Sequence, residues 1–258
     1  MNISIASYAF YGLLREGKMD VFGYLETCKY RYGLASADIW NGFLPTIEDD
    51  YLAKLKDGLD ERELVLANLC VDGPHIWEDD PEVRAKHHTD GLAYLHAAEL
   101  LGARTIRIDA GVRADTFTDE QFDTIVARYR EYAQRAYDNG TKVGPENHWG
   151  AEAVPENMVR ICKAVDHPGF GMLLHFRGNA GDALMARWAM HTHVSMEVVT
   201  SSLEQSMTML RDAGYTGFWG VEHHSGNGEY AEVAIQVARV RDVLGRWKAA
   251  GRTAGRAG

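Results

Sequence analysis

Basic residues are in the minority in this 258-residue chain, which carries 27 Lys and Arg against 37 Asp and Glu, a net charge of -10. Affinity for nucleic acid comes mostly from Lys and Arg side chains on phosphates, so this balance argues against a nucleic-acid-binding protein. With 46% apolar and 25% charged residues, the composition is otherwise that of an ordinary globular protein.

Cysteine is also scarce. Cys28, Cys70 and Cys162 are far apart and odd in number, and no CxxC spacing occurs, which excludes a disulfide framework and a zinc ribbon. We expect three reduced, mostly buried thiols. The start "MNISIASYAF" has no basic segment followed by a long apolar one, and no stretch approaches the ~20 apolar residues of a membrane span. The expectation is therefore a cytoplasmic protein without a signal peptide or membrane contact.

What the chain does contain is a series of short apolar segments with helical patterns between them. The segments are "ISIAS" (3–7), "ASADIW" (35–40), "LVLANLCV" (64–71), "RTIRIDA" (104–110), "TKVGPE" (141–146), "FGMLLH" (170–175), "AMHTHV" (189–194) and "FWGVE" (218–222). Dividing 258 residues by eight segments gives about 32 residues per unit, the size of a strand followed by a helix.

The intervening stretches have helical periodicity and helix-end signals. Pro81 and Pro155 stand where a first helical turn would begin, and Gly102 and Gly214 where helices would end. One apolar face comprises Phe122, Ile125, Val126, Tyr129, Ala133 and Ala136, and another comprises Val233, Val237, Val240, Leu244 and Trp247. Eight such units predict a single α/β domain, a (β/α)8 TIM barrel over residues 1–250, followed by a flexible tail at 251–258. The alternative is a doubly wound sheet, but the glycine-rich phosphate loop typical of that fold is missing after the first segment.

Alternation along the strands predicts which side chains point into the barrel. The inward set becomes polar toward the carboxyl ends of several strands, whereas a packed barrel interior is mostly Val, Ile and Leu. Its members are Ser36, Asp38, Trp40, Thr105, Arg107, Asp109, His191, His193, Gly220 and Glu222. Active sites of this fold lie at that rim, so the polar ends indicate function.

Four residues stand at the ends of consecutive predicted strands: Glu146, His175, His193 and Glu222. Their spacings are 29 (175−146), 18 (193−175) and 29 (222−193) residues. Neighbouring strands lie ~4.8 Å apart, so the four side chains could surround one ion. Two imidazoles and two carboxylates suit Mn²⁺, Zn²⁺, Fe²⁺ or Co²⁺. Any one of these residues could instead be structural, and His191 is expected one layer deeper, beside the site or in the core.

Several stretches resemble the sugar phosphate isomerase/epimerase superfamily, the xylose isomerase-like TIM barrels. They are "YGLASADIW", with Asp38 where Glu is usual, "AAELLGARTIRIDAG", "PENHWG", "MHTHVSM" and "AGYTGFWGVEHH". Their order and spacing cover nearly the whole chain. The superfamily includes ketose 3-epimerases, hydroxypyruvate isomerases, inosose dehydratases and isomerases, and 3-dehydroshikimate dehydratases.

The resemblance implies roles for the four rim residues. Glu146, His193 and Glu222 match three of the family's four usual metal ligands, and His175 stands where the fourth, normally Asp, is expected. The implied cofactor is a divalent metal ion, Mn²⁺ first, with Zn²⁺, Fe²⁺, Co²⁺ or Mg²⁺ as alternatives. Glu146 and Glu222 would be catalytic, moving a proton on and off the carbon beside a carbonyl.

Other residues are candidates for holding substrate. His148 and Trp149, which follow Glu146, would line the pocket. His75 could donate or accept a hydrogen bond, and Arg107 and Arg177 could hold a carboxylate or phosphate. Trp40, with Tyr8, Phe10 and Tyr11, could form an aromatic wall against a sugar. For each of them an interior salt bridge, a solvent contact or core packing is the alternative.

The resemblance implies an isomerase or epimerase of a small keto sugar or polyhydroxy ketone, and we expect no nucleic-acid or membrane partner. Three alternatives remain open: a dehydratase that uses the same enediolate, a non-catalytic protein whose metal site has decayed, and a DNA-repair endonuclease. The net charge of -10 opposes the last. The sequence does not name the substrate, and it leaves homo-oligomer formation open.

Overall fold

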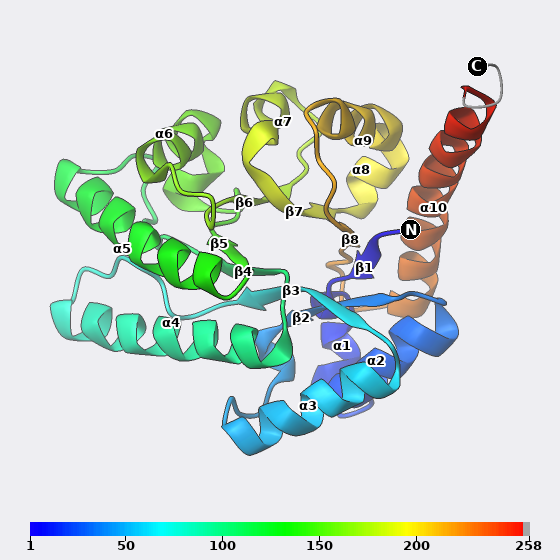
Figure 1. Cartoon of the computed structure of the whole chain (residues 1–258), viewed down its shortest axis with the longest axis horizontal. Coiled ribbons are helices and arrows are strands. Elements are labelled where there is room, and N and C mark those ends of the chain that lie inside the picture. Colours follow the sequence, from blue (N-terminus) through cyan, green and yellow to red (C-terminus); the bar gives the residue numbers. More distant parts are fainter. Residues whose placement is uncertain (255–258) are drawn as a thin grey trace.

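A computed structural model describes residues 1–254 and shows eight parallel strands alternating with helices along the chain (Figure 1). The strands are β1 (Ile3–Ile5), β2 (Ser36–Trp40), β3 (Val65–Val71), β4 (Thr105–Ile108), β5 (Lys142–Gly144), β6 (Met172–His175), β7 (Ala189–Val194) and β8 (Trp219–Val221). Each of the eight apolar segments of the sequence contains one of them.

The strands form two four-stranded parallel sheets that join into one ring. One sheet has the order β1-β8-β7-β6 and the other β2-β3-β4-β5. Isolated parallel bridges connect the two sheets at both edges, between Ala6 and Asp38 on one side, and between Val143 and Phe170 and between Glu146 and Leu173 on the other. The predicted (β/α)8 TIM barrel is confirmed.

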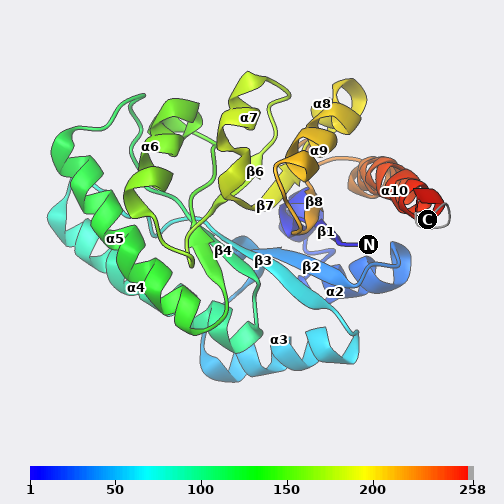
Figure 2. The same ribbon diagram turned by 45° about the horizontal axis from the view of Figure 1, so that its top comes forward.

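Helices surround the strands on the outside, and Figure 2 shows the same arrangement from a second direction. They are α1 (Tyr11–Arg15), α2 (Val21–Glu26), α3 (Asp49–Glu61), α4 (Pro81–Leu101), α5 (Asp119–Asp138), α6 (Pro155–Val165), α7 (Ala180–Met185), α8 (Met196–Ser201), α9 (Leu203–Asp212) and α10 (Glu229–Ala254). The boundary that the sequence suggested between barrel and tail, at residue 250, falls within α10, and residues 255–258 lie outside the described part.

Local sequence accounts for where the long helices begin and end. Pro81 is the first residue of α4, where its missing N–H is no loss, and Gly102 ends that helix at φ 66°, a conformation that glycine adopts without strain. Helix α5 begins with a capping box between Thr118 and Gln121. Its predicted apolar face is buried from Ile125 to Ala136. These elements hold the strand ends, and hence the rim, in place.

The barrel interior contains hydrogen-bonded polar side chains, among them Asp38 and Thr105, for which the alternation predicted an inward direction. Asn68 Nδ2 donates to Asp38 Oδ1 at 3.0 Å, and Thr105 Oγ1 donates to Asn68 Oδ1 at 2.8 Å. Ile106 and Ile108, on the opposite face of β4, are fully buried in the hydrophobic core. Polar side chains that form hydrogen bonds with one another therefore occupy interior positions that aliphatic side chains usually fill.

The three cysteines are free and buried, as expected from their number and spacing. None of the helices within residues 1–254 is both long enough and apolar enough to cross a membrane.

Candidate metal centre

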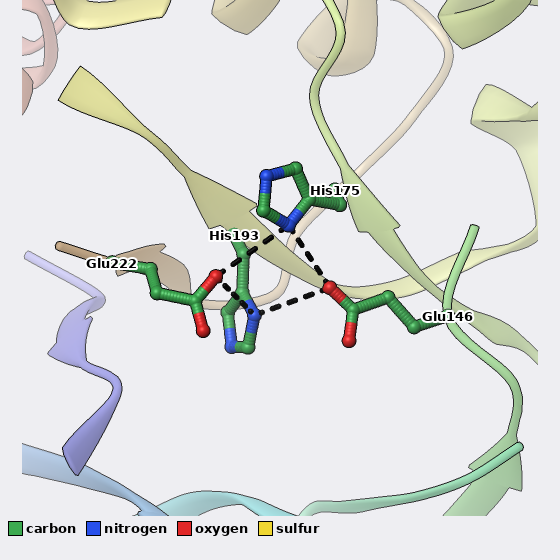
Figure 3. Close-up of side chains that lie close together, drawn as sticks. All are labelled: Glu146, His175, His193 and Glu222. Carbon is green, nitrogen blue, oxygen red and sulfur yellow. Dashed lines mark hydrogen bonds and ion pairs between the residues drawn. The ribbon is translucent and has the colours of Figure 1, made fainter. Parts of the chain in front are cut away.

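Glu146, His175, His193 and Glu222 meet at the carboxyl ends of four adjacent strands. Glu146 follows β5, His175 ends β6, His193 is the second-last residue of β7, and Glu222 follows β8. Figure 3 shows the four side chains pointing toward one another, and one ligand atom from each lies within 4.8 Å of the others. All four are buried, with 2%, 4%, 0% and 7% of their surface exposed. The geometry thus brings together the constellation that the sequence predicted.

The separations between the ligand atoms fit a small cation. His175 Nδ1 lies 3.0 Å from Glu146 Oε1 and 3.5 Å from Glu222 Oε2. His193 Nδ1 lies 3.6 Å and 3.3 Å from the same two oxygens. A tetrahedral ion with bonds of ~2.0–2.1 Å places its ligands about 3.3–3.4 Å apart. The four measured distances scatter around that value, so one transition-metal ion fits among these atoms.

His193 is held in the orientation that a metal ligand needs. Its Nε2 lies 3.0 Å from Asp38 Oδ2, and the same carboxylate oxygen lies 2.7 Å from His191 Nε2. His193 Nδ1 is buried and has no hydrogen-bond partner among the described residues. Because a carboxylate accepts the Nε2 proton, Nδ1, which faces Glu146 and Glu222, is the nitrogen that could bind a metal after losing its own proton. The unpartnered nitrogen is what a bound cation would satisfy.

Asp38 is ionised in this arrangement. Burial alone would raise its pKa, but His191 and His193 together hold it below its usual range. His191 lies one layer deeper than His193, as its position in the HxH pair suggested. The negative charge of Asp38 therefore lies behind the imidazole of His193, on the side away from the two glutamates.

His175 is positioned through its backbone and its ring. Asn147 Oδ1 accepts a hydrogen bond from the His175 N–H at 2.7 Å, and Asn147 Nδ2 donates to the His175 carbonyl at 2.9 Å. The ring stacks with the rings of His148 and His224, with 5.6 Å between ring centroids in both contacts and interplanar angles of 9° and 21°. These contacts direct Nδ1 toward the two glutamates.

The cluster favours a positive charge at its centre. Burial would raise the pKa of both Glu146 and Glu222, yet their imidazole neighbours, and Arg107 in the case of Glu146, hold both values well below the usual range. Burial would lower the pKa of His193, but Glu222, Asp38 and Glu146 raise it well above the ordinary value. In the absence of a metal, the ionised carboxylates thus favour a protonated His193. A bound divalent cation would displace this proton and supply the positive charge instead.

Arg107 neutralises part of the acidic rim from inside the barrel. Its Nη1 donates to Asp72 at 2.8 Å and to Asp109 at 2.7 Å, and its Nε lies 3.4 Å from Glu146 Oε2. Nε and Nη2 also contact the sulfur of Cys70, at 3.1 Å and 2.8 Å. Most of the N–H donors of Arg107 are therefore used within the protein. This matches the interior salt bridge that the sequence offered as the alternative to substrate binding.

A cavity of about 160 Å³ opens beside the cluster. Its lining includes three of the residues predicted to hold substrate, namely Trp40, Arg107 and His148. The others are Tyr8, Cys70, Asp72, Glu146, Glu222 and His224. A larger groove of about 960 Å³ lies on the side of β6 to β8 and is lined by His148, His175, His224 and Arg177 among others. Both hollows therefore reach the cluster of Glu146, His175, His193 and Glu222.

Two predicted substrate residues lie elsewhere. Within the described structure, neither His75 nor Trp149 lines the cavity or the groove. The two rings pack edge to face, with 5.2 Å between their centroids, and Trp149 Nε1 donates to Asp109 Oδ2 at 3.4 Å. Phe10, from the suggested aromatic wall, is fully buried in the core, whereas Tyr8 packs on Trp40 with ring centroids 5.0 Å apart.

The sequence-based set missed His224 and the positioning role of Asn147. His224 Nε2 lies 3.0 Å from Glu222 Oε2, and this hydrogen bond raises the pKa of His224. Strand alternation does not mark His224, because β8 ends at Val221, three residues before it. Asn147 left no signal either, since its partner is backbone 28 residues away.

Comparison with known families decides the lineage. The model of the xylose isomerase-like TIM barrel family matches residues 30–177, more than half of the chain. The chain belongs to the xylose isomerase-like TIM barrel family. This confirms the resemblance found in the sequence motifs. A search of curated proteins finds no significant match to the chain.

Several solved structures are similar over nearly the whole chain. An IolI protein with a bound zinc atom has a TM-score of 0.76 at 16% identity, covering 95% of this chain and 99% of that one. D-psicose 3-epimerase from Clostridium cellulolyticum H10, with D-tagatose, has a TM-score of 0.72 at 16% identity and coverages of 95% and 97%. AsbF from Bacillus anthracis, described as a "probable 3-DHS dehydratase", has a TM-score of 0.70 at 16% identity and coverages of 92% and 98%. At this identity the likeness shows the shared fold.

Proposed function

We propose that the protein is a divalent-metal-dependent isomerase or epimerase of a small keto sugar or polyhydroxy ketone, acting by proton transfer through an enediolate. The observation that carries the proposal is the placement of Glu146 and Glu222 on either side of the His193 Nδ1 atom. Each carboxylate contributes one oxygen to the cluster, and both residues line the adjoining cavity. A substrate in that cavity would be flanked by two bases and one metal site.

The proposed metal ligands are Glu146, His175, His193 and Glu222. The unpartnered Nδ1 of His193 and the mixed imidazole and carboxylate donors support a transition metal, with Mn²⁺ the first candidate. The zinc atom bound by the structurally similar IolI protein supports the presence of a metal in this protein. A bound divalent cation would polarise the substrate carbonyl and stabilise the charge of the enediolate.

The chain's own groups would keep the two carboxylates ready to accept a proton. The lowered pKa values of Glu146 and Glu222 leave both deprotonated at neutral pH. Arg107 Nε lies 3.4 Å from Glu146 Oε2, and His224 Nε2 lies 3.0 Å from Glu222 Oε2. Each carboxylate is therefore held in place by a neighbouring nitrogen donor. A placed carboxylate base contributes roughly 10²–10⁴-fold to such a proton transfer. Trp40 and Tyr8 would cover one face of the substrate.

A dehydratase of a related polyol ketone is a second candidate, because a proton donor lies next to the cavity. His224 has a raised pKa owing to its hydrogen bond with Glu222, and it lines both hollows. A protonated imidazole in that place could protonate a departing β-hydroxyl once the enediolate has formed. The product mass separates the two reactions, since only the dehydratase releases water.

The test combines metal content with isotope uptake. Protein purified without chelator is analysed for metal and then incubated with a panel of small keto sugars in heavy water. We expect at least one equivalent of metal in the protein and deuterium at the carbon next to the carbonyl in the product. Glu146→Gln and Glu222→Gln should each lose ~10²-fold or more of turnover.

Glu152→Gln is the matched control, because Glu152 is buried near the same rim but outside the cluster. Its Oε1 accepts from the Ala110 N–H at 2.8 Å, and burial raises its pKa well above the usual range, so Gln resembles its protonated form. Turnover without deuterium uptake would indicate hydride transfer and end the assignment of the bases. Absence of metal and of turnover would favour a non-catalytic binding protein.

A further inference from the structure

A second group of metal-ligating side chains lies apart from the rim cluster, where the connection from β3 to α4 meets the helix. His75 and Glu78 belong to this connection, and His87 lies on the second turn of α4. One ligand atom from each residue lies within 4.8 Å of the others, and all three side chains are partly buried. Two imidazoles and one carboxylate make a donor set that zinc proteins use.

The distances within this group fit a bound ion. His75 Nδ1 lies 3.0 Å from Glu78 Oε1, and His87 Nδ1 lies 3.5 Å from the same oxygen. These values bracket the separation of about 3.3–3.4 Å between the ligands of a tetrahedral zinc ion. Both imidazole nitrogens therefore lie close to the same carboxylate oxygen, Glu78 Oε1.

An unpartnered nitrogen points into the group. His87 Nδ1 is buried, and it forms no hydrogen bond with Glu78 or with any other residue in the described part of the chain. Leaving a buried polar nitrogen without a partner is unfavourable, so such atoms in native proteins call for an explanation. A cation coordinated by His87 Nδ1 would supply the missing partner.

The surroundings hold the ligands in place and favour positive charge. Arg84 Nε donates to the Glu78 carbonyl at 2.8 Å, and the Arg84 guanidinium lies over the Trp77 ring at 3.7 Å. Trp77 Nε1 donates to Asp79 at 3.0 Å. The stretch "EDDPEVR" from 78 to 84 contains four acidic residues and one basic residue. The connection is thus fixed by its own contacts and carries a net negative charge.

We propose that His75, Glu78 and His87 bind a second divalent ion, of the Zn²⁺ class, with water completing the coordination. The ion would fasten the connection from β3 to helix α4. Because the His75 ring packs against Trp149, which contacts Asp109 at the rim, the ion would also support one wall of the rim. This site is independent of the metal centre proposed for catalysis.

Co²⁺ titration of the chelator-stripped full chain tests the proposal, with binding followed by calorimetry and by visible absorption of the bound ion. Wild type should bind two equivalents, and His193→Ala should keep one. His87→Ala and the isosteric Glu78→Gln should each weaken Co²⁺ affinity at the second site by at least ~10-fold. Loss of a residue that only hydrogen-bonds to a ligand already costs ~10–100-fold in metal affinity, and these variants remove a ligand itself. Circular dichroism before titration verifies that each variant is folded.

His88→Ala is the matched control, since His88 is the next residue on α4 and its Nε2 contacts Glu131 at 2.9 Å instead. It should still bind two equivalents. The proposal is overturned if wild type, His87→Ala and Glu78→Gln bind the same number of ions with the same affinity, or if His88→Ala loses as much as His87→Ala. If instead the metal centre proposed for catalysis does not bind the ion, His193→Ala will bind the same number of equivalents as wild type. That result leaves the second site unaffected.

Discussion

Asp38 Oδ2 and His193 Nε2 lie 3.0 Å apart, although 155 residues separate them in the chain. The contact turns the opposite ring nitrogen of His193 toward Glu146 and Glu222. The carboxylate behind the imidazole thus sets which nitrogen can act as a ligand.

Asp38→Asn tests this relationship. The Asn amide can donate to His193 Nε2, which would place the ring proton on Nδ1, the atom that faces the cluster. We expect metal affinity at the rim to fall ~10–100-fold, the usual effect of losing an outer carboxylate partner. Calorimetric titration measures it, with Glu152→Gln as the control that should bind as wild type does. Equal affinity in Asp38→Asn and wild type would show that Asp38 does not orient the ligand.

Replacing His175 tests whether it is a ligand. His175→Ala removes one of four donors and should weaken Mn²⁺ binding at the rim, whereas His175→Asp should restore binding and raise the relative affinity for Mg²⁺, because carboxylate is a harder donor than imidazole. Competition titrations with both ions measure this preference. If His175→Ala binds Mn²⁺ as tightly as wild type, then Glu146, His193 and Glu222 hold the metal without it.

Metal affinity should depend on pH through His193. Burial lowers the pKa of this imidazole, but Glu222, Asp38 and Glu146 raise it well above the ordinary value in the metal-free protein. Because the metal binds the deprotonated nitrogen, affinity is full above the raised pKa and falls about tenfold per pH unit below it. Calorimetry at pH 7 in buffers of different ionisation enthalpy should detect release of close to one proton per metal. Binding without proton release would mean that His193 is already neutral.

The two arginines near the site should differ in their effect on stability. Arg107→Met leaves the buried Asp109 and Glu146 without their cationic partner and should lower the free energy of unfolding by about 3–5 kcal/mol. Arg177→Met removes hydrogen bonds from Nη2 to the carbonyls of Asn147 and His148, which lie closer to solvent, and should cost less. Urea unfolding compares the two variants. Equal losses would contradict the interior role assigned to Arg107.

The fold was predictable because the signals were local and repeated. Each strand segment carried its own apolar run, and helix ends were marked by residues such as Pro81 and Gly102. The four rim residues followed from the same repetition, since parallel strands end at one rim. All the strands except β7 are shorter than the segments that contain them. For example, β5 ends at Gly144, before Pro145, which has no N–H to donate to the ladder.

Contacts between distant segments were not predictable from the sequence. Asp38 meets His193 only because β2 and β7 face each other across the barrel interior, and strand alternation shows the face of a side chain but not its partner. The contact between His75 and Glu78 lies in an irregular connection that has no periodicity to interpret. These pairings depend on how the ring closes and on loop shape, which are properties of the whole fold.

The most direct test of the account is a crystal structure of protein soaked in Mn²⁺, with anomalous scattering recorded to locate the ion. The account predicts a peak about 2.0–2.3 Å from Glu146 Oε1, His175 Nδ1, His193 Nδ1 and Glu222 Oε2. A crystal that holds Mn²⁺ elsewhere, with no peak among these four atoms, would contradict the central claim that they form one metal centre.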